Sequence, residues 1–277
     1  MPDTLPLNSA LSVELPPSEI HPTAIIARGA ELGAGVRVGP YCTIGRHSVL
    51  EDGVRLISHV VIDGHTRVGA GAVLYPFCTV GLAPQDLKYR DEPTRCEIGR
   101  RTQIREHCTV HRGTVTGRGI TQVGNDCMLM AVAHVAHDCI LGDNVIIANN
   151  AVMGGHVTIA EHAVIGGAAA IHQFVRIGRA AMIGGVSGVE ADVIPFGSVI
   201  GNRARLAGLN VIGLKRRGFN KSQIQRLYAA FRVLFGKTGL FAQRLAETRE
   251  RYGKDPLIAE ILAFIDAPSY RGLIRAE

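Results

Sequence analysis

The sequence contains no tryptophan, and aromatic residues make up only 5% of its 277 residues. Glycine is abundant by contrast, with 33 copies, which indicates many tight corners around a core of aliphatic side chains. No stretch approaches the roughly 20 apolar residues that a membrane-spanning helix needs. The first residues show neither a basic segment nor an apolar run. We therefore expect no signal peptide, a cytoplasmic location and reduced thiols.

The sequence also lacks basic blocks interleaved with aromatic residues. Its net charge of +6 would suit acidic partners, but this distribution of charge argues against nucleic acid. Hydrophobic residues reach 47%, so the chain should bury a sizeable core. Its length allows one large domain or two modest ones.

Aliphatic residues recur at every sixth position. The series runs from Ile20 to Val80, continues in phase from Ile98 to Val110, and resumes one residue out of step from Val123 to Val189. A period of six excludes an amphipathic helix and fits short parallel strands wound into a β-helix, with one corner per hexapeptide. Three hexapeptides per coil give a triangular prism with coils about 4.8 Å apart, in which residues 18 apart share a column. The period does not indicate the hand of the coil.

Two kinds of small residue fit this repeat. Glycine and asparagine, such as Asn149 and Asn150, should supply the positive φ angles that the corners require. Five of the six cysteines fall at the fourth residue after an aliphatic position: Cys42, Cys78, Cys108, Cys127 and Cys139. We expect them to pack in the core, which weakens the case for a disulfide or a cysteine-bound metal.

The repeat is interrupted twice, at residues 83–97 and 111–121, and we expect binding residues in these insertions because loops on a rigid scaffold often carry them. We predict a leader over residues 1–19, a β-helix domain over residues 20–205 and a helical domain over residues 206–277.

Helical spacing begins around Ile224 in the C-terminal part. Asn220 and Gln223 form a plausible capping pair for this helix. Two further helices should follow, the first ending at Gly253 and the second starting at Pro256.

Candidate chemistry gathers in one strip of one prism corner. The segments AHD, GGH and HQ fall there on three successive coils, because they are spaced by 18 residues: His137 and Asp138, Gly155 and His156, His172 and Gln173. His111 and His134 belong to other columns, so we expect that only a neighbouring subunit could bring them to this strip.

Several interpretations of the strip are open. Its histidines could be solvated rim residues, or three histidines could hold zinc between subunits, as in β-helix enzymes of the carbonic anhydrase type. The prism could also be a scaffold that merely binds a ligand. We favour general base catalysis, in which His137 is tuned by Asp138 and removes a proton from an attacking hydroxyl. Gly155 would let a backbone N–H approach a developing oxyanion.

The segments QDLKY, HRGT, AHDC, GGH, HQF and GLKRRGF resemble the UDP-N-acetylglucosamine O-acyltransferase family that begins lipid A synthesis. The resemblance runs from about Ile20 to the C-terminus. It implies a left-handed parallel β-helix with a C-terminal α-helical domain, assembled as a homotrimer with active sites between subunits. The implied reaction moves a 3-hydroxyacyl chain from acyl carrier protein to the glucosamine 3-hydroxyl of UDP-N-acetylglucosamine, without metal or cofactor.

The resemblance also assigns roles. His137 would be the general base, Asp138 its partner and Gly155 the oxyanion contact. Contacts to the sugar or hydroxyacyl group would come from Gln85, Asp86, Lys88, His111, His134 and His156. His172 and Gln173 would line the acyl-pantetheine path. Phosphates of the nucleotide and the carrier would meet Asn210, Arg216 and Arg217. An attraction for the acidic carrier would come from Arg95, Arg100, Arg101 and Arg105.

Three positions bear on specificity. Gly185 matches a place where relatives carry glycine or a bulkier residue that limits acyl length, so glycine implies a donor of about fourteen carbons along coils about 4.8 Å apart. Alternatively, Gly185 only serves a left-handed corner angle. Ile212 stands where the family often has glutamate, so uridine contacts would differ. Relatives that acylate a 3-amino sugar give an alternative acceptor. Residues 1–19 are too few for the uridine-binding domain of the relatives that acylate the 2-amine.

Overall fold

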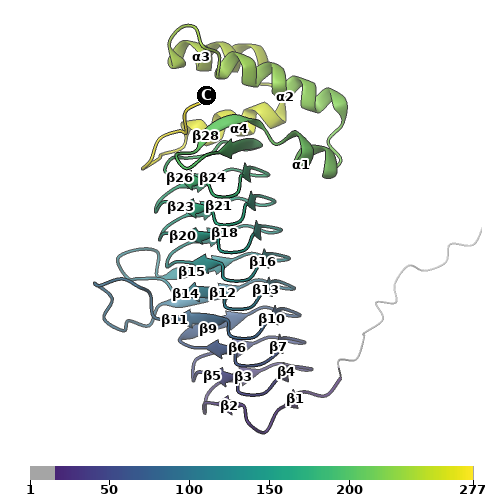
Figure 1. The fold of residues 1–277 in the computed structure, drawn as a ribbon, viewed down its shortest axis with the longest axis vertical. Coiled ribbons are helices and arrows are strands. Elements are labelled where there is room, and N and C mark those ends of the chain that lie inside the picture. Colours follow the sequence, from purple (N-terminus) through teal and green to yellow (C-terminus); the bar gives the residue numbers. More distant parts are fainter. Residues whose placement is uncertain (1–15, 277) are drawn as a thin grey trace, which may run out of the picture.

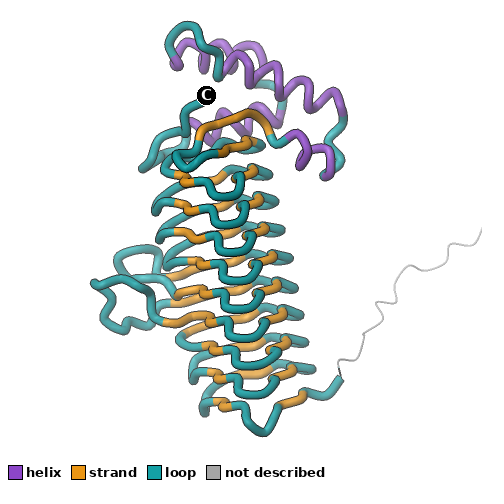
Figure 2. Tube along the Cα trace, viewed as in Figure 1, coloured by secondary structure: helices purple, strands orange, loops and turns teal. Residues whose placement is uncertain are grey.

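The computed structural model describes residues 16–276, so most of the predicted leader lies outside the described residues. The chain forms a tall prism of stacked coils with helices gathered at its C-terminal end (Figures 1 and 2). This confirms a left-handed parallel β-helix of hexapeptide repeats followed by C-terminal helices. Among the described residues, the structure contains no helix both long enough and apolar enough to span a membrane.

The prism has three faces, each a sheet of short strands. The first sheet consists of β1 Glu19–Ile20, β4 Arg37–Val38, β7 Arg55–Leu56, β10 Val73–Leu74, β13 Gln103–Ile104, β16 Met128–Leu129, β19 Ile146–Ile147, β22 Val164–Ile165, β25 Met182–Ile183, β27 Gly197–Ile200 and β28 Arg205–Leu209. The second consists of β2 Ile25–Ile26, β5 Thr43–Ile44, β8 Val61–Ile62, β11 Thr79–Leu82, β14 Thr109–His111, β17 His134–Val135, β20 Val152–Met153, β23 Ala170–Ile171 and β26 Gly188–Val189. The third consists of β3 Glu31–Leu32, β6 Val49–Leu50, β9 His65–Val68, β12 Arg95–Ile98, β15 Ile120–Val123, β18 Ile140–Leu141, β21 Thr158–Ile159 and β24 Arg176–Ile177.

The strand register confirms the column rule. Met128 pairs with Ile146, 18 residues later, in a parallel ladder. The spacing widens only across the insertions, as in the pairing of Gln103 with Met128. The repeating aliphatic residue of each inner coil points into the core, where Ile147 and Ile165 are fully buried. All six cysteines are buried and free, as predicted for the five that share one place in the repeat; Cys96 is the sixth.

The corners differ from the prediction in part. The third residue after each aliphatic position generally has a positive φ, and Asn150 is one of these residues, but Asn149 is not. Most of the others are neither glycine nor asparagine, as at Val186 (φ 57°). Glycine directly after an aliphatic residue has another cause. A Cβ on Gly166 would lie 2.5 Å from the backbone nitrogen of Gly185, so close stacking of the coils excludes a side chain there.

The helices are α1 Val211–Arg216, α2 Lys221–Leu234, α3 Phe241–Tyr252 and α4 Pro256–Asp266. The predicted capping pair is confirmed, because Asn220 and Gln223 form a reciprocal capping box on α2. Gly253 and Pro256 also take their predicted places at the end of α3 and the start of α4. The sequence spacing did not predict α1. Strand β28 pairs antiparallel with β27 and crosses the predicted domain boundary at residue 206.

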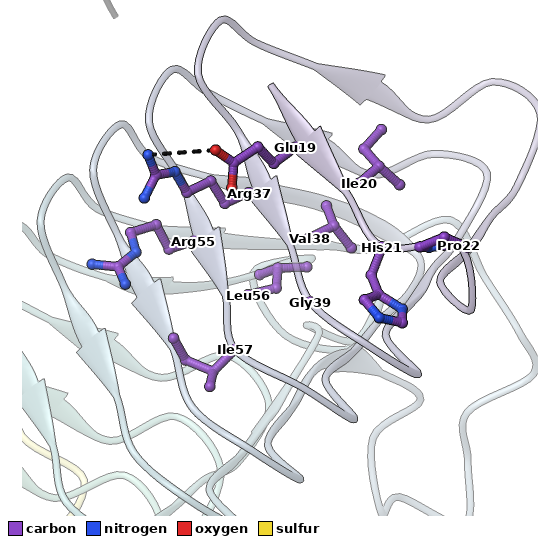
Figure 3. Close-up of a pocket in the computed structure, with 10 residues that line it drawn as sticks. All are labelled: Glu19, Ile20, His21, Pro22, Arg37, Val38, Gly39, Arg55, Leu56 and Ile57. Atoms are coloured by element: carbon purple, nitrogen blue, oxygen red, sulfur yellow. Dashed lines mark ion pairs between the residues drawn. The ribbon is translucent and has the colours of Figure 1, made fainter. Parts of the chain in front are cut away.

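The segment after α4 returns to the last coils of the prism. Leu273 forms a parallel bridge with Asp192, and Ala276 forms one with Leu206. Figure 3 shows the opposite end, where Glu19 and Arg37 form an ion pair of 3.7 Å beside a hollow of about 490 Å³. This hollow lies on the first coils, several coils away from the His137 corner.

Candidate functional site

The second insertion encloses the carboxylate of Asp138. This insertion leaves the prism after β14 and returns at β15, and Figure 1 shows both insertions projecting from one side of the prism. The Asp138 side chain is fully buried. It accepts hydrogen bonds from the Thr114 hydroxyl (2.6 Å), the Thr114 N–H (3.2 Å), the Arg118 N–H (2.8 Å) and the Gly119 N–H (3.1 Å).

These hydrogen bonds keep Asp138 ionised. Burial alone would raise the pKa of its carboxyl group, but hydrogen bonds from His137, Thr114 and Arg118 outweigh burial and lower the pKa to about 2. A buried charge is tolerated only when such partners replace the lost water. The negative charge on Asp138 is therefore a permanent feature of the site at neutral pH.

His137 is oriented by this charge. Its Nδ1 lies 2.9 Å from Oδ2 of Asp138. Because an ionised carboxylate only accepts hydrogen bonds, Nδ1 carries the proton in the neutral ring and Nε2 carries the lone pair. The ring packs directly over Gly155, where a Cβ would collide with it. The His137 side chain retains 17% exposure, so the base remains accessible from outside.

Gly155 brings an unused donor to the same place. Its carbonyl accepts from the Phe174 N–H at 3.1 Å, but in the described part of the chain its own N–H donates no hydrogen bond. Gly155 is predominantly buried. A free backbone N–H beside a base is the donor that a developing oxyanion requires.

His156 extends the strip by one coil, as predicted. Its N–H donates to the His137 carbonyl at 3.0 Å, and its ring meets the His137 ring edge to face at 5.0 Å. Burial lowers the pKa of His156, while the charges of Asp138 and Asp86 act in the opposite direction. Asp86, in the first insertion, therefore lies close enough to the strip to act on it electrostatically.

We expected that only another subunit could bring His111 and His134 to the strip, but within one chain both lie near enough to His137 for its charge to act on their pKa values. Their rings contact each other at 4.9 Å. Burial, followed by the charges of His134 and His137, lowers the pKa of His111 to about 4. Burial and His137 also lower the pKa of His134. Column arithmetic separated these residues because it ignores the reach of side chains across a corner.

His111 also has an unpaired buried atom. The residue is 6% exposed, and its Nδ1 has no hydrogen-bond partner among the described residues. His134 instead pairs its Nδ1 with the Thr109 hydroxyl at 2.6 Å. The ring of His111 therefore keeps one polar atom without a partner inside the described part of the protein, which is uncommon for a buried polar group.

The first insertion is clamped to the prism by a buried arginine. Arg112 donates to the Tyr89 hydroxyl (2.6 Å), the Gly81 carbonyl (3.1 Å) and Asp91 (3.1 Å). Two of the three predicted sugar contacts on this insertion, Gln85 and Lys88, are exposed, and the third, Asp86, is half-buried. The loop therefore presents polar side chains from a fixed base.

Asn210, Arg216 and Arg217 gather elsewhere, beside α1. With Ile212 they line a cavity of about 950 Å³ against the first sheet, which also includes Met128. This cavity lies along the corner between the third and first sheets, whereas His137 lies at the corner between the second and third. One chain therefore places the two predicted clusters on different edges of the prism.

Two of these side chains also serve the fold. Asn210 caps α1 by accepting from the Gly213 N–H at 3.0 Å, and it donates to the Ala180 carbonyl at 2.9 Å. Arg217 donates to the His162 carbonyl at 2.6 Å. Arg216 is exposed and free of such bonds among the described residues. Sequence reasoning assigned all three to ligand binding and did not anticipate these structural bonds.

The remaining predicted residues lie at the surface. His172 and Gln173 are exposed on the coil beyond His156. Gly185 is exposed, and its φ is not positive, so the structure gives no support to a corner-angle role, while its role in acyl length remains a prediction. Three of the four arginines expected to attract an acidic carrier are already paired with carboxylates: Arg95 with Glu97, Arg101 with Asp126 and Arg105 with Glu106.

His137, Asp138 and His156 could in principle share a metal ion, because one ligand atom from each lies within 4.8 Å of the others. The carboxylate is the obstacle to this arrangement, since its oxygens already accept bonds from the insertion and from His137. A metal would have to displace these donors from a fully buried group.

Sequence reasoning missed the residues that hold Asp138. Thr114, Arg118 and Gly119 lie in the insertion that was flagged for binding, but only as a loop without assigned roles. One feature of the sequence could have indicated them. Asp138 falls in a repeat that should be buried, so its carboxylate needs hydrogen-bond donors, and the insertion at residues 111–121 is the nearest irregular segment that could supply them.

Comparisons with known proteins agree over nearly the whole chain. Residues 192–274 match the family described as UDP N-acetylglucosamine O-acyltransferase, domain 2, and residues 120–155 match the bacterial transferase hexapeptide family. An acyl-(acyl-carrier-protein)–UDP-N-acetylglucosamine O-acyltransferase of Azorhizobium caulinodans is 56% identical, with 92% of this chain and 94% of the relative covered. A Rickettsia canadensis protein of the same name is 50% identical, with 94% and 98% covered. The structure of a UDP-N-acetylglucosamine acyltransferase from Campylobacter jejuni superimposes with a TM-score of 0.88 at 35% identity, covering 94% of this chain and all of that chain.

The grip on Asp138 predicts a pH-dependent stability. A carboxyl group whose pKa is lowered in the folded state stabilises the protein above its unfolded pKa of 3.8, and this contribution, ~2 kcal/mol, is lost as pH falls from about 4 to about 2. Thr114→Val removes one donor, so it should lower the free energy of unfolding by ~1–2 kcal/mol at pH 7 and by less at pH 3. Thr114→Ser, the matched control, keeps the hydroxyl and the wild-type profile. Urea unfolding at pH 7 and pH 3 measures the free energy of unfolding of both variants. Equal free energies for Thr114→Val and Thr114→Ser would contradict the role of the Thr114 hydroxyl.

Proposed function

This chain belongs to the acyl-carrier-protein-dependent UDP-N-acetylglucosamine O-acyltransferase family, and we infer that it catalyses the reaction of that family. A 3-hydroxyacyl chain passes from acyl carrier protein to the glucosamine 3-hydroxyl of UDP-N-acetylglucosamine, the first step of lipid A biosynthesis. The relatives are named O-acyltransferases, which favours the hydroxyl over a 3-amino acceptor. We place the reaction in the cytoplasm.

The observation that carries the mechanism is the ionised, fully bonded Asp138 on Nδ1 of His137. Nε2 of His137 takes the proton of the sugar 3-hydroxyl as its oxygen attacks the thioester carbonyl carbon. The carbonyl oxygen becomes an oxyanion, which the free Gly155 N–H stabilises. The intermediate collapses, the carbon–sulfur bond breaks, and the departing pantetheine sulfur receives the proton from His137. Asp138 stabilises the imidazolium between these two transfers.

Polar groups around the strip would bind the acceptor. Asp86 is near enough for its charge to act on the pKa of His156, and a sugar or hydroxyacyl oxygen that reached the buried Nδ1 of His111 would supply the partner that this atom lacks among the described residues. At the α1 cavity the exposed Arg216 suits a nucleotide phosphate. Ile212, 68% exposed at the same cavity, offers uridine an apolar contact instead of a carboxylate.

We propose that the protein is a homotrimer in which one site combines two chains. The sugar and the nucleotide of a single substrate must bind together, yet one chain places the His137 strip and the α1 cavity on different prism edges. Apolar side chains on the outside of the prism support contact between subunits. The outer side of the first sheet, beside the α1 cavity, carries Met128, Ile146, Val164 and Met182. The edge between the first and second sheets exposes Tyr41 and Phe77, at 59% and 50%. An apolar face and edge of this kind are typical of subunit contacts.

His137→Ala should lower kcat by ~10³-fold or more, because it removes the base. The matched control is His47→Ala, which alters a histidine at the same corner of the prism several coils away. Steady-state turnover, with the trimer checked by light scattering, measures the effect. Activity of His137→Ala within a few-fold of the wild type would contradict the assignment.

Turnover should also survive treatment with metal chelators. Stoichiometric zinc that is required for activity would instead support the carbonic anhydrase type of site.

Mixed trimers test the shared site. His137→Ala and Arg216→Ala should each be nearly inactive alone. Random co-assembly should restore up to about a quarter of wild-type activity, because some interfaces then combine an intact His137 with an intact Arg216 from the neighbouring chain. If both residues served one chain's own site, the mixture would remain inactive. The control mixes the two variants as preformed trimers under conditions without subunit exchange, and this mixture should stay inactive.

A further inference from the structure

A line of aromatic rings connects His137 to the C-terminal segment. The His137 ring contacts His156 at 5.0 Å, and His156 stacks on Phe174 at 4.4 Å with the planes parallel to within 1°. Phe174 in turn contacts Tyr270 at 5.2 Å. Each ring lies one level further along the same prism edge. The mechanism above uses only the first of these four rings.

The C-terminal segment is fixed at the end of this line. Ser269 donates its hydroxyl to the buried Asp192 at 2.6 Å, and the Asp192 N–H donates to the Gly272 carbonyl at 2.8 Å. The Arg271 Nε donates to the Gln173 carbonyl at 2.8 Å. Tyr270 and Arg271 are thus anchored by hydrogen bonds on both sides, and Arg271 is attached to a residue predicted to line the pantetheine path.

Tyr270 and Arg271 nevertheless leave much of their surface unused. Tyr270 is 88% exposed although its ring packs on Phe174. Arg271 forms no ion pair with any carboxylate of residues 16–276. The exposed aromatic ring of Tyr270 and the Arg271 cation without a counter-charge are features of a binding surface.

The distances fit one particular ligand. The Arg271 guanidinium bonds the carbonyl of Gln173, which lies two coils beyond His137. Two coil spacings of about 4.8 Å place this cation ~10 Å from the level of His137. The pantetheine arm between a thioester sulfur and its phosphate has about as many chain bonds as four residues, so it reaches ~14 Å when extended. An arm whose thioester lies at His137 is therefore long enough to bring its phosphate to Arg271.

We propose that Tyr270 and Arg271 bind the phosphopantetheine arm of the acyl donor. Tyr270 packs against the arm, and the Arg271 guanidinium binds the phosphate that joins the arm to the carrier protein. This inference rests on the proposed function, because it requires a carrier-linked donor whose thioester reaches His137.

The test compares two donors, the 3-hydroxyacyl carrier protein and 3-hydroxyacyl-pantetheine without its phosphate. Arg271→Gln should raise KM for the carrier-linked donor about tenfold while kcat and KM for UDP-N-acetylglucosamine stay within twofold. It should leave KM for the phosphate-free donor unchanged. Arg275→Gln, an exposed cation on the same segment, is the matched control and should behave as the wild type.

A second pair of variants tests the ring. Tyr270→Ala should raise KM for both donors several-fold, and Tyr270→Phe should restore it, because the contact is with the face of the ring. Unchanged KM values in Arg271→Gln and Tyr270→Ala, with an active wild type, would overturn this inference alone. An equal rise of KM for both donors in Arg271→Gln would overturn the phosphate contact. A well-folded wild type that transfers no acyl group would overturn the proposed function and this inference with it.

Discussion

The site depends on one buried negative charge. Taking the Asp138 carboxylate out of water is costly, and the hydrogen bonds from the second insertion offset that cost. The interruption of the repeat is therefore part of the chemistry: an uninterrupted coil would offer no N–H groups from Arg118 and Gly119 above the corner. Once the charge is fixed, the proton position on His137 follows, and the outward nitrogen becomes a base.

The prism contributes the geometry. Because successive coils stack in register, the spacing of two residues along the sequence sets their separation along a prism edge. Residues 18 positions apart therefore become neighbours on adjacent coils. Close stacking also explains why Gly155 follows the His137 corner: a side chain there would occupy the space of the imidazole ring. The rigid edge then sets a length scale along which an extended arm can lie. Each insertion and the C-terminal segment attach to this edge, so the parts of the chain that do not repeat gather at one strip.

The sequence was sufficient for the parts of the molecule that repeat. Periodicity predicted the strands, the core cysteines and the strip of His137, Gly155 and His156, because each follows from one spacing. It failed where side chains cross between columns, as for His111 and His134, and where close backbones rather than φ angles require glycine, as at Gly166. The donors to Asp138 and the ring of Tyr270 were also missed, since insertions and chain ends have no period from which contacts could be predicted. The second role of Asn210, as a helix cap, is invisible until α1 is seen.

Asp138 holds His137 in one tautomer, with the proton on Nδ1 and a free Nε2. Nitrogen-15 NMR of the protein with labelled histidine measures this directly, with His137→Ala used to assign the signal. In the neutral ring we predict a protonated, pyrrole-type shift for Nδ1 and an unprotonated, pyridine-type shift for Nε2, with the pattern weakened in Thr114→Val. A dominant Nε2–H tautomer of His137 in the wild-type protein would contradict the account, because the nitrogen facing the substrate could then not accept a proton.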